Sequence, residues 1–449
     1  MSHRTRSAPV VPDPLSSTVP KYDSTYGNPA AAFCVAAPAF AGPALASAPL
    51  AASALWLVSS NVLFAACQWA SVVALAKLGA PVALGHLGLA LAVATPVVLV
   101  TGFALRAYQA TDVFRRYAFA AYLSLRLLAN VVAGAVIVTA AVVSGLDAAA
   151  FAVVIPIGAA KLAEATSETC YGLAQRHDRM RFVAVSRMAR GACGQLGLVT
   201  VVARGGTLAD GAWALAAVWT AFLVAVDLPV ASGLEPIFVR TPLATLGRLA
   251  RESAPLGAVN GVFAVSQSLP RYLLQGSHGP AAVGYYTALA AVVPALSQLA
   301  TAVCHAAAPR LGWTAATDAG RYRVLVGRLL GLAVLVSLLL TAGAALLGRG
   351  FLALAYADDY AAYHGTFVAV VLAAGLGVVN EVQYFALLAV RKLRAQLVIQ
   401  SVGLGVTALA GLALVPRFGV GGAAGAAVLA GAATAAVGAW ALLGRGSER

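Results

Sequence analysis

Charged residues are scarce in this chain, at 10% of its 449 residues. A soluble globular protein is about a quarter charged and near half apolar, whereas 61% of this sequence is apolar and its mean hydropathy is +0.86. This shortage of charge excludes an ordinary soluble enzyme, a disordered protein and a nucleic-acid-binding domain. A helix that spans the hydrocarbon core takes about 20 mostly apolar residues. The chain has about a dozen such stretches, which indicates an all-α polytopic membrane protein.

Cysteines and catalytic motifs are also few. The five cysteines are scattered and form no CxxC pair, so we expect neither a disulfide framework nor a metal site. The sequence has no GxxxxGK[ST], HExxH or GxSxG pattern, and no expected loop exceeds about 20 residues. We therefore expect a protein that is not an enzyme and holds no cofactor.

Prolines gather at the start of the chain, where eight of the 20 lie at or before Pro49. Proline removes a backbone donor and breaks helices, so this stretch is not expected to span lipid. Arg4 and Arg6 fit the basic start of a secretory signal, but no uninterrupted apolar core follows them. We expect residues 1–46 to form a disordered cytoplasmic tail, followed by two lobes at 47–240 and 241–449.

Apolar runs of spanning length predict twelve transmembrane helices. Their expected ranges are 50–76, 82–105, 118–143, 148–173, 182–203, 211–233, 253–275, 280–305, 326–347, 362–388, 395–415 and 419–443.

The distribution of Lys and Arg predicts the orientation, because these residues collect in cytoplasmic loops. With the amino terminus inside, the cytoplasmic segments and adjoining helix ends carry 23 of the 30 Lys and Arg, Arg187 and Arg190 among them. Both termini are therefore expected in the cytoplasm, with the protein in the cytoplasmic membrane. The asymmetry accounts for most of the net charge of +14 without a nucleic-acid partner. The opposite face carries Lys77, Arg204, Arg349 and Arg417, and three cations lie inside spans, namely Arg126, Lys161 and Arg271.

The two halves of the chain repeat. A shift of 199 residues gives eleven identities in 37 ungapped positions, where roughly four are expected by chance. Six spans per half make a parallel repeat, related by an axis along the membrane normal. We expect two six-helix lobes around a central cavity, which rock to open one side and then the other. The matched pairs include Asn61 and Asn260, Gln68 and Gln267, Pro81 and Pro280, Gly85 and Gly284, and the Glu-x-x-Tyr motifs at Glu168 and Glu381.

Four stretches carry a family resemblance: YLSLRLL at 122–128, KLAEATSETCYGLAQRHDR at 161–179, PRYLL at 270–274 with GPAAVGYY at 279–286, and LVPRFGVGGAA at 414–424. With the repeat, the chain resembles the multidrug/oligosaccharidyl-lipid/polysaccharide (MOP) flippase superfamily, and within it the Wzx-type polysaccharide and O-antigen flippases. The resemblance covers about residues 50–443.

The resemblance implies a flippase for cell-surface polysaccharide biosynthesis, lipopolysaccharide O-antigen included. Its substrate would be an oligosaccharide linked by pyrophosphate to a polyprenol in the membrane lipid. Its implied partners are a polysaccharide polymerase or glycosyltransferases, and either a proton or a sodium ion is open as the coupling ion.

Ionisable groups inside spans cost about 2.5–3.5 kcal/mol on insertion scales and usually face a cavity. Lys161 lies deep in its span, with Glu164 and Glu168 on the same helix face. It can meet a pyrophosphate, or pair with Glu164 and lock the packing. Arg271 follows Pro270, which removes one ladder hydrogen bond and bends a helix. We expect Arg271 either to line the cavity or to reach the outer interface.

Arg126 is open as a ligand contact or a cytoplasmic interface residue. Glu381 is expected to pair with Lys161 or to carry a coupled proton, because its sequence neighbourhood holds no cation. The polar pairs of the repeat either line the cleft or make interhelical hydrogen bonds. They are Asn61, Gln68, Asn260 and Gln267.

Other functions stay open at the sequence level. A multidrug/cation antiporter of the MATE type relies on buried carboxylates, and a buried Lys and Arg would oppose a cationic drug; both signs of charge are present here, which favours an anionic substrate without settling the choice. Lipid II flippases usually carry fourteen helices, against twelve expected here. A membrane-embedded polymerase or ligase is disfavoured by the missing outer loop.

Overall fold

The computed structural model describes residues 48–79, 81–112, 115–237, 239–390 and 392–443. Throughout these ranges the regular structure is helical and no strand occurs, which confirms the all-α prediction. The described residues belong to one compact unit, and the division into lobes near residue 240 stays a prediction. The tail expected at 1–46 lies outside the described residues.

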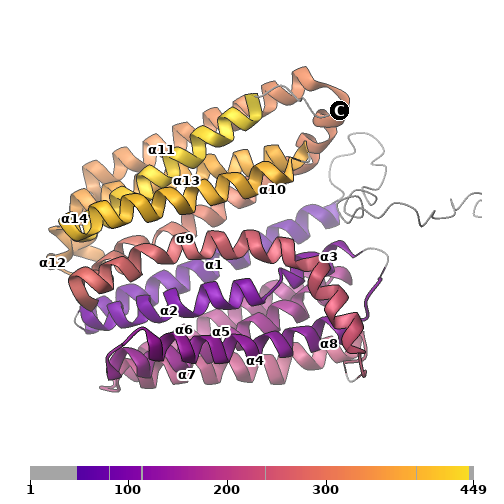
Figure 1. Cartoon of the computed structure of the whole chain (residues 1–449), viewed down its shortest axis with the longest axis horizontal. Helices are drawn as coiled ribbons and strands as arrows, with labels where there is room; N and C mark the ends of the chain where they lie inside the picture. The colour runs from indigo at the N-terminus through magenta and orange to yellow at the C-terminus, as the bar shows by residue number, and fades with distance from the viewer. Residues whose placement is uncertain (1–47, 80, 113–114, 238, 391, 444–449) are drawn as a thin grey trace, which may run out of the picture. The chain divides into compact units, whose positions relative to one another are not determined.

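Figure 1 shows the helices. Most lie on the predicted spans, but three extend well beyond them: the span predicted at 253–275 begins at Leu243, the one predicted to end at 305 ends at Thr317, and the one predicted at 326–347 covers Ala319–Ala355. A π-helical segment, Leu223–Asp227 (η2), joins α7 to α8. The helices are α1 (Ala48–Leu78), α2 (Pro81–Thr101), α3 (Leu105–Thr111), α4 (Phe119–Val143), α5 (Ala148–Arg176), α6 (Met180–Ala203), α7 (Leu208–Phe222), α8 (Leu228–Leu234), α9 (Leu243–Ala290), α10 (Val293–Thr317), α11 (Ala319–Ala355), α12 (Asp358–Ala361), α13 (His364–Ala389) and α14 (Leu393–Leu443).

Nine stretches of the described residues are long and apolar enough to cross a membrane, and two of them are double. Leu243–Thr301 has 59 residues and Arg394–Leu443 has 50, whereas a bilayer core needs about 20. Each contains one glycine with positive φ, Gly279 (φ 76°) and Gly419 (φ 52°), where the helix kinks. Divided at these glycines, the two double stretches become four, which makes eleven spans. The twelfth is α6, whose arginines lower its hydropathy. The total agrees with the twelve helices predicted.

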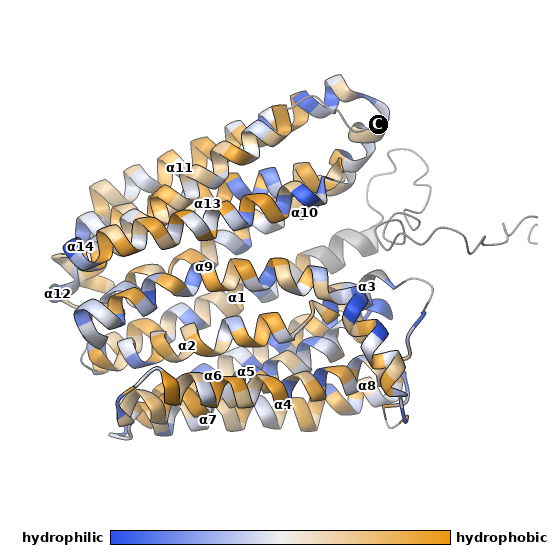
Figure 2. Ribbon diagram, in the orientation of Figure 1, coloured by the Kyte–Doolittle hydropathy of each residue, from blue (hydrophilic) through white to orange (hydrophobic). Residues whose placement is uncertain are grey.

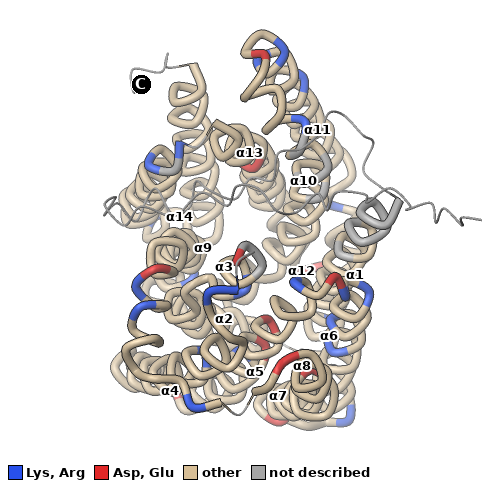
Figure 3. Tube along the Cα trace, turned by 90° about the vertical axis from the view of Figure 1, so that its right-hand side faces the viewer, with Lys and Arg blue, Asp and Glu red and all other residues tan. Residues whose placement is uncertain are grey.

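The surface of the bundle is apolar, as contact with lipid requires. Figure 2 shows hydrophobic residues along the lengths of the helices. On α11, Leu346 is 83% exposed, and on α4 Val143 is 79% exposed. Figure 3 looks onto the end that carries α3 and α8, where Lys and Arg residues gather at the ends of helices. The chain is thus a multi-pass membrane protein.

The two halves pack against each other chiefly through α2 and α9, with a smaller contact between α1 and α10. A repeat-related pair makes the tightest approach. A Cβ on Gly85 would lie 1.9 Å from the carbonyl oxygen of Pro280, and a Cβ on Gly284 would lie 1.8 Å from that of Pro81. Because the repeat matches Pro81 with Pro280 and Gly85 with Gly284, the two contacts are copies of one another, as a twofold axis between the halves requires.

Aromatic side chains join the halves at the same end. The Trp69 Nε1–H donates to the Tyr356 hydroxyl at 3.1 Å, and that hydroxyl donates to the carbonyl of Ala288 at 2.8 Å. The Lys77 ammonium donates to the carbonyl of Leu354 at 2.9 Å. These contacts hold the halves together at the end predicted to face away from the cytoplasm.

Candidate functional site

A group of charged side chains lies inside the first half, between α5, α6 and α7. Lys161 and Glu164 on α5 are one turn apart, and the Lys161 Nζ donates to Glu164 Oε2 at 2.8 Å. Arg190 on α6 approaches the other oxygen, with Nη2 3.6 Å from Glu164 Oε1. Trp219 on α7 closes the group, because both cations lie over its ring at 5.7 Å and 5.3 Å. We call Lys161, Glu164, Arg190 and Trp219 the cation cluster.

Arg190 is the unusual member of the cation cluster. Its side chain is fully buried, and none of its three guanidinium nitrogens has a hydrogen-bond partner among the described residues. The rings of Trp219 and Tyr171, 5.3 Å and 5.5 Å from its Cζ, supply cation–π contacts instead. Burial of a charged group without hydrogen bonds is costly, and among the described residues Glu164, 3.6 Å away, is the ion-pair partner of this guanidinium.

A second ion pair lies two turns along α5. Glu168 accepts a hydrogen bond from Arg106 of α3, and both side chains are about three-quarters buried. Glu168 is therefore paired with a cation from another helix, and its role in substrate binding stays a prediction.

A buried carboxyl adjoins the cation cluster on the π-helical segment. Asp227 is fully buried, and its Oδ1 accepts from the Ser186 hydroxyl at 2.6 Å. That hydroxyl is also 3.0 Å from the Tyr171 hydroxyl. The π-bulge, a feature common at functional sites, precedes Pro229 and places Asp227 against α5 and α6. A polar chain thus runs from Asp227 to the residues around Arg190.

The arrangement has a definite chemical capacity. Within the cation cluster, Lys161 and Arg190 share one carboxylate, Glu164, and Glu168 and Asp227 also interact electrostatically with Arg190. In a low-dielectric interior the guanidinium interacts strongly with any anion that comes within reach. A phosphate or carboxylate that reached Arg190 would gain a bidentate, charge-assisted contact. The described residues contain no group of three or more His, Cys, Asp or Glu side chains placed to hold a metal ion.

Arg126 is a buried clamp within the first half. It is 5% exposed, and it donates to the carbonyl of Gly102 at 2.9 Å and to the Thr169 hydroxyl at 3.3 Å. These contacts tie α4 to α5 and to the end of α2. In this structure Arg126 therefore contributes to helix packing. A contact between Arg126 and a substrate stays a prediction, and it would require these hydrogen bonds to break.

Arg271 lies on α9 with its Cζ 5.7 Å from the ring centre of Tyr286. Its Nη1 donates to the carbonyl of Gln267 at 3.1 Å, and its Nε has no hydrogen-bond partner among the described residues. Pro270 lies inside α9, whose non-helical backbone is at Gly279, so the bend expected at Pro270 stays a prediction. Glycine adopts a positive φ at little steric cost, so the helix can be interrupted at Gly279. The φ that proline fixes is compatible with helical backbone.

Glu381 on α13 makes its hydrogen bond within the second half. Its Oε1 accepts from the Thr301 hydroxyl of α10 at 2.9 Å, and no ion pair of the described residues includes it. The neighbouring Asn380 and Gln383 donate to Thr434 and Ala435 of α14. Lys161 has Glu164 as its carboxylate partner, which fits the packing alternative better than a Lys161–Glu381 pair.

The polar repeat pairs differ in their surroundings. Asn61 on α1 keeps a buried Oδ1 without a hydrogen-bond partner, and Gln68 is partly buried. Their counterparts on α9, Asn260 and Gln267, are exposed. All four stay candidates, because exposed polar side chains within a span suit a water-filled cleft better than lipid.

Sequence reasoning missed Arg190, Trp219 and Arg106. Arg190 was assigned to a cytoplasmic helix end, yet it is the eleventh residue of α6, about 15 Å from its start. This depth in the helix is a signal in the sequence that Arg190 lies inside the span. Nothing in the sequence indicated that α3 would bring Arg106 to Glu168.

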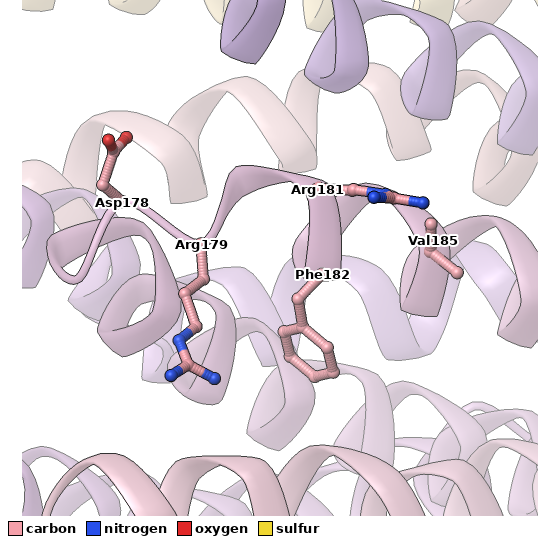
Figure 4. Close-up of a pocket in the computed structure, with 5 residues that line it drawn as sticks. All are labelled: Asp178, Arg179, Arg181, Phe182 and Val185. Carbon is pink, nitrogen blue, oxygen red and sulfur yellow. The ribbon is translucent and has the colours of Figure 1, made fainter. Parts of the chain in front are cut away.

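Two open pockets lie outside the cation cluster. One, of about 470 Å³, is formed at the α5–α6 turn by Asp178, Arg179, Arg181, Phe182 and Val185. Figure 4 shows these side chains pointing in different directions, so they do not converge on one ligand. The other, of about 450 Å³, lies between the kinks of α9 and α14.

An ion network lies at the ends of α5 and α8, with His177 and Glu235 just beyond the candidate spans. Glu235 accepts hydrogen bonds from Arg176, from His177 Nε2 at 3.2 Å and from the Phe119 amide at 3.2 Å. Burial by itself raises the pKa of Glu235, but the bonds from His177 and Arg176 outweigh it and hold the pKa below its usual value. This network fastens α4, α5 and α8 together.

Comparison with known proteins places the fold. No protein-family profile matches the chain, and no curated protein sequence matches it. Solved structures do. The lipid II flippase MurJ, in its inward closed conformation, matches with a TM-score of 0.71 at 9% identity over 87% of each chain.

The MATE multidrug transporter DinF-BH, in complex with R6G, matches with a TM-score of 0.66 at 14% identity, over 89% of this chain and 95% of that one. The eukaryotic MATE transporter AtDTX14 matches with a TM-score of 0.59 at 14% identity over the same shares. A further match is a MATE family transporter described as a member of the MOP superfamily, with a TM-score of 0.59 at 14% identity. At these identities the likeness establishes a shared fold, that of multi-span membrane transporters.

Proposed function

We propose that this chain is a flippase that moves a polyprenyl-pyrophosphate-linked oligosaccharide across the cytoplasmic membrane by alternating access. The fold supports a transporter, since the solved structures that share it are transporters and a flippase. The product would be delivered for assembly of a cell-surface polysaccharide. No chemical step is required of the chain, so we propose that it is not an enzyme.

One observation carries the choice of an anionic substrate: the cation cluster with its unsatisfied guanidinium. Arg190 has no hydrogen-bond partner for its nitrogens, and Lys161 keeps 17% of its side chain exposed. A pyrophosphate that replaced part of the Glu164 contact would satisfy both cations. A cationic drug would meet this group with repulsion, which disfavours the MATE type of antiport.

A lipid II flippase is the second candidate, because MurJ shares the fold with a TM-score of 0.71. Both candidates handle a polyprenyl pyrophosphate, so the cation cluster serves either one. They differ in the attached head, which is a peptide-bearing sugar in lipid II.

The test is reconstitution of the purified chain in proteoliposomes with fluorescent polyprenyl-pyrophosphate oligosaccharides, with dithionite quenching as the measure of flipping. We expect wild-type vesicles to flip a lipid with a peptide-free oligosaccharide, and Lys161→Ala to stop this transport while the protein stays inserted. Lys161→Arg keeps the charge and should retain part of the rate. Arg349→Gln, an exposed cation at the predicted outer face, is the control.

Three results would redirect the proposal. Flipping of lipid II alone would assign the second candidate. Proton-driven export of a cationic dye, with no lipid flipping, would assign a MATE-type antiporter. Normal flipping by Lys161→Ala would make the cation cluster a packing element.

A further inference from the structure

A pocket of about 450 Å³ lies between α9 and α14, in the second half of the chain and away from the cation cluster. Its walls include His278, Tyr285, Tyr363, Arg417, Phe418 and Gly419. We call it the kink pocket. Its volume falls within the range of small-molecule sites, about 300–1,000 Å³.

The backbone of two helices is bent to make the kink pocket. Gly279 of α9 and Gly419 of α14 have positive φ, which side chains with a Cβ rarely adopt. A Cβ on Gly419 would lie 3.3 Å from the His278 ring, so the two kinks also approach each other. The shape of the pocket is thus set by backbone geometry.

Aromatic rings form one side of the kink pocket. The rings of Tyr285 and Tyr363 are 4.5 Å apart with an interplanar angle of 31°. Tyr285 also contacts Tyr360 at 5.0 Å, and Tyr360 stacks on Tyr356 at 5.2 Å. Because Tyr356 bonds to the first half through Trp69, the aromatic wall of the pocket is continuous with the contact between the halves.

The kink pocket also carries a cation. Arg417 is exposed, and no acidic side chain of the described residues pairs with it. Phe418 beside it is 65% exposed. Arg417 is one of the four cations predicted on the face away from the cytoplasm, so the pocket opens where a delivered glycan would emerge.

We propose that the kink pocket binds an acidic sugar, a pyranose ring that bears a carboxylate. The apolar C–H face of a pyranose fits an aromatic ring, whose face is electron-rich. The planar guanidinium of Arg417 matches a carboxylate through two parallel hydrogen bonds. The inference rests on the proposed function, since it assigns the pocket to the emerging oligosaccharide head.

The test is equilibrium binding of sodium glucuronate and of glucose to the full chain in detergent, by saturation-transfer NMR and calorimetry. Glucuronate should bind more tightly than glucose. Arg417→Gln should raise the Kd for glucuronate about tenfold, as expected for loss of a charge-assisted contact, and leave glucose unchanged. Phe418→Ala should weaken both sugars. Matched controls are Arg349→Gln and Trp213→Ala, two exposed side chains outside the pocket.

Equal affinity for the two sugars, or an unchanged Kd in Arg417→Gln, overturns the proposal. Displacement of glucuronate by short-chain phosphatidylglycerol at lower concentration assigns the pocket to a lipid headgroup and overturns it too. Binding needs no transport, so the two proposals fail separately. Lost glucuronate binding with intact flipping refutes the kink pocket alone, and intact binding without flipping refutes the flippase alone.

Discussion

Arg190 is the residue of the cation cluster whose role can be tested most directly. Its guanidinium is fully buried, with Glu164 3.6 Å away and aromatic rings on its other sides. Removing one partner of a buried charged pair costs about 3–5 kcal/mol when the other charge is left unpaired. Glu164 keeps Lys161 as a partner, so we expect a smaller cost here, mainly from the two lost cation–π contacts. The cost of Arg190→Gln should therefore appear as a lower melting temperature in detergent, together with lost flipping.

The variant Arg190→Lys separates stability from transport. It keeps a cation beside Glu164, so its melting temperature should lie closer to wild type than that of Arg190→Gln. Flipping should stay low, because an ammonium lacks the two parallel donors with which a guanidinium binds a phosphate. Wild-type values of both properties in Arg190→Lys would show that the guanidinium serves packing alone.

Glu235 gives a pH-dependent prediction outside the membrane. Its pKa is lowered in the folded chain, so its contribution to stability is present above the unfolded value of about 4.3 and is lost as pH falls through the folded pKa. At pH 7, Glu235→Gln should lower the free energy of unfolding by about 1–2 kcal/mol. The melting difference from wild type should shrink below pH 4; a difference that stays constant down to pH 3 would contradict the ionic origin.

At the residue scale the sequence could predict contacts along one helix but not between helices. Lys161 and Glu164 pair as their i, i+3 spacing indicates. Arg190 and Arg106 reach the same network from α6 and α3, and their approach depends on how those helices are rotated and packed. Counting charges predicts that these arginines lie toward the cytoplasmic side, but it gives no information on how the helices are rotated.

At the scale of elements, the lengths of the apolar runs predict the positions of most helices. The hydrocarbon core fixes the length of an apolar helix, so α4 and α13 end within two residues of their predicted limits. The extensions were missed, because they lie beyond the apolar run. The first turns of α9, from Leu243 onward, carry Arg248, Arg251 and Glu252, which interrupt the apolar run, although Leu246 and Leu249 have helical spacing and are buried.

The crossing of α2 and α9 predicts matched effects at two positions. Gly85→Ala and Gly284→Ala each place a Cβ less than 2 Å from a backbone carbonyl oxygen, so the helices must move apart. Overpacking of this kind costs about 1–3 kcal/mol, and the two variants should lower the melting temperature by similar amounts because the contacts are related by the repeat. Gly276→Ala on α9, where a Cβ meets nothing within 4 Å, is the control. A melting temperature of Gly85→Ala equal to that of Gly276→Ala would refute the tight crossing.

Across the whole molecule, Glu381 is the carboxyl expected to change protonation during transport. It accepts from Thr301 and belongs to no ion pair of the described residues, while Glu168 is bound to Arg106. Glu381→Gln should remove the pH dependence of flipping, and Glu168→Gln should weaken substrate binding with the pH profile kept. The measurement is the initial flipping rate between pH 5.5 and 8. An unchanged profile in Glu381→Gln would leave sodium as the coupling ion to test.

The orientation of the whole chain is the last prediction, and it depends on both charge and fold. Figure 1 places α3 and α8 at one end of the helices and α12 at the other. The chain turns near residues 110, 180, 245, 315 and 392, each separated from the next by an even number of spans. Since an even number of crossings returns a chain to the same side, all five turns share one side of the membrane. The excess of Lys and Arg on that side predicts that it is the cytoplasm. Reporter fusions after these five residues should all read cytoplasmic, and fusions after residues 145 and 205 should read external. One of the five reading external would break the pairing of helices, whereas all seven reading reversed would keep the fold and invert the direction of transport.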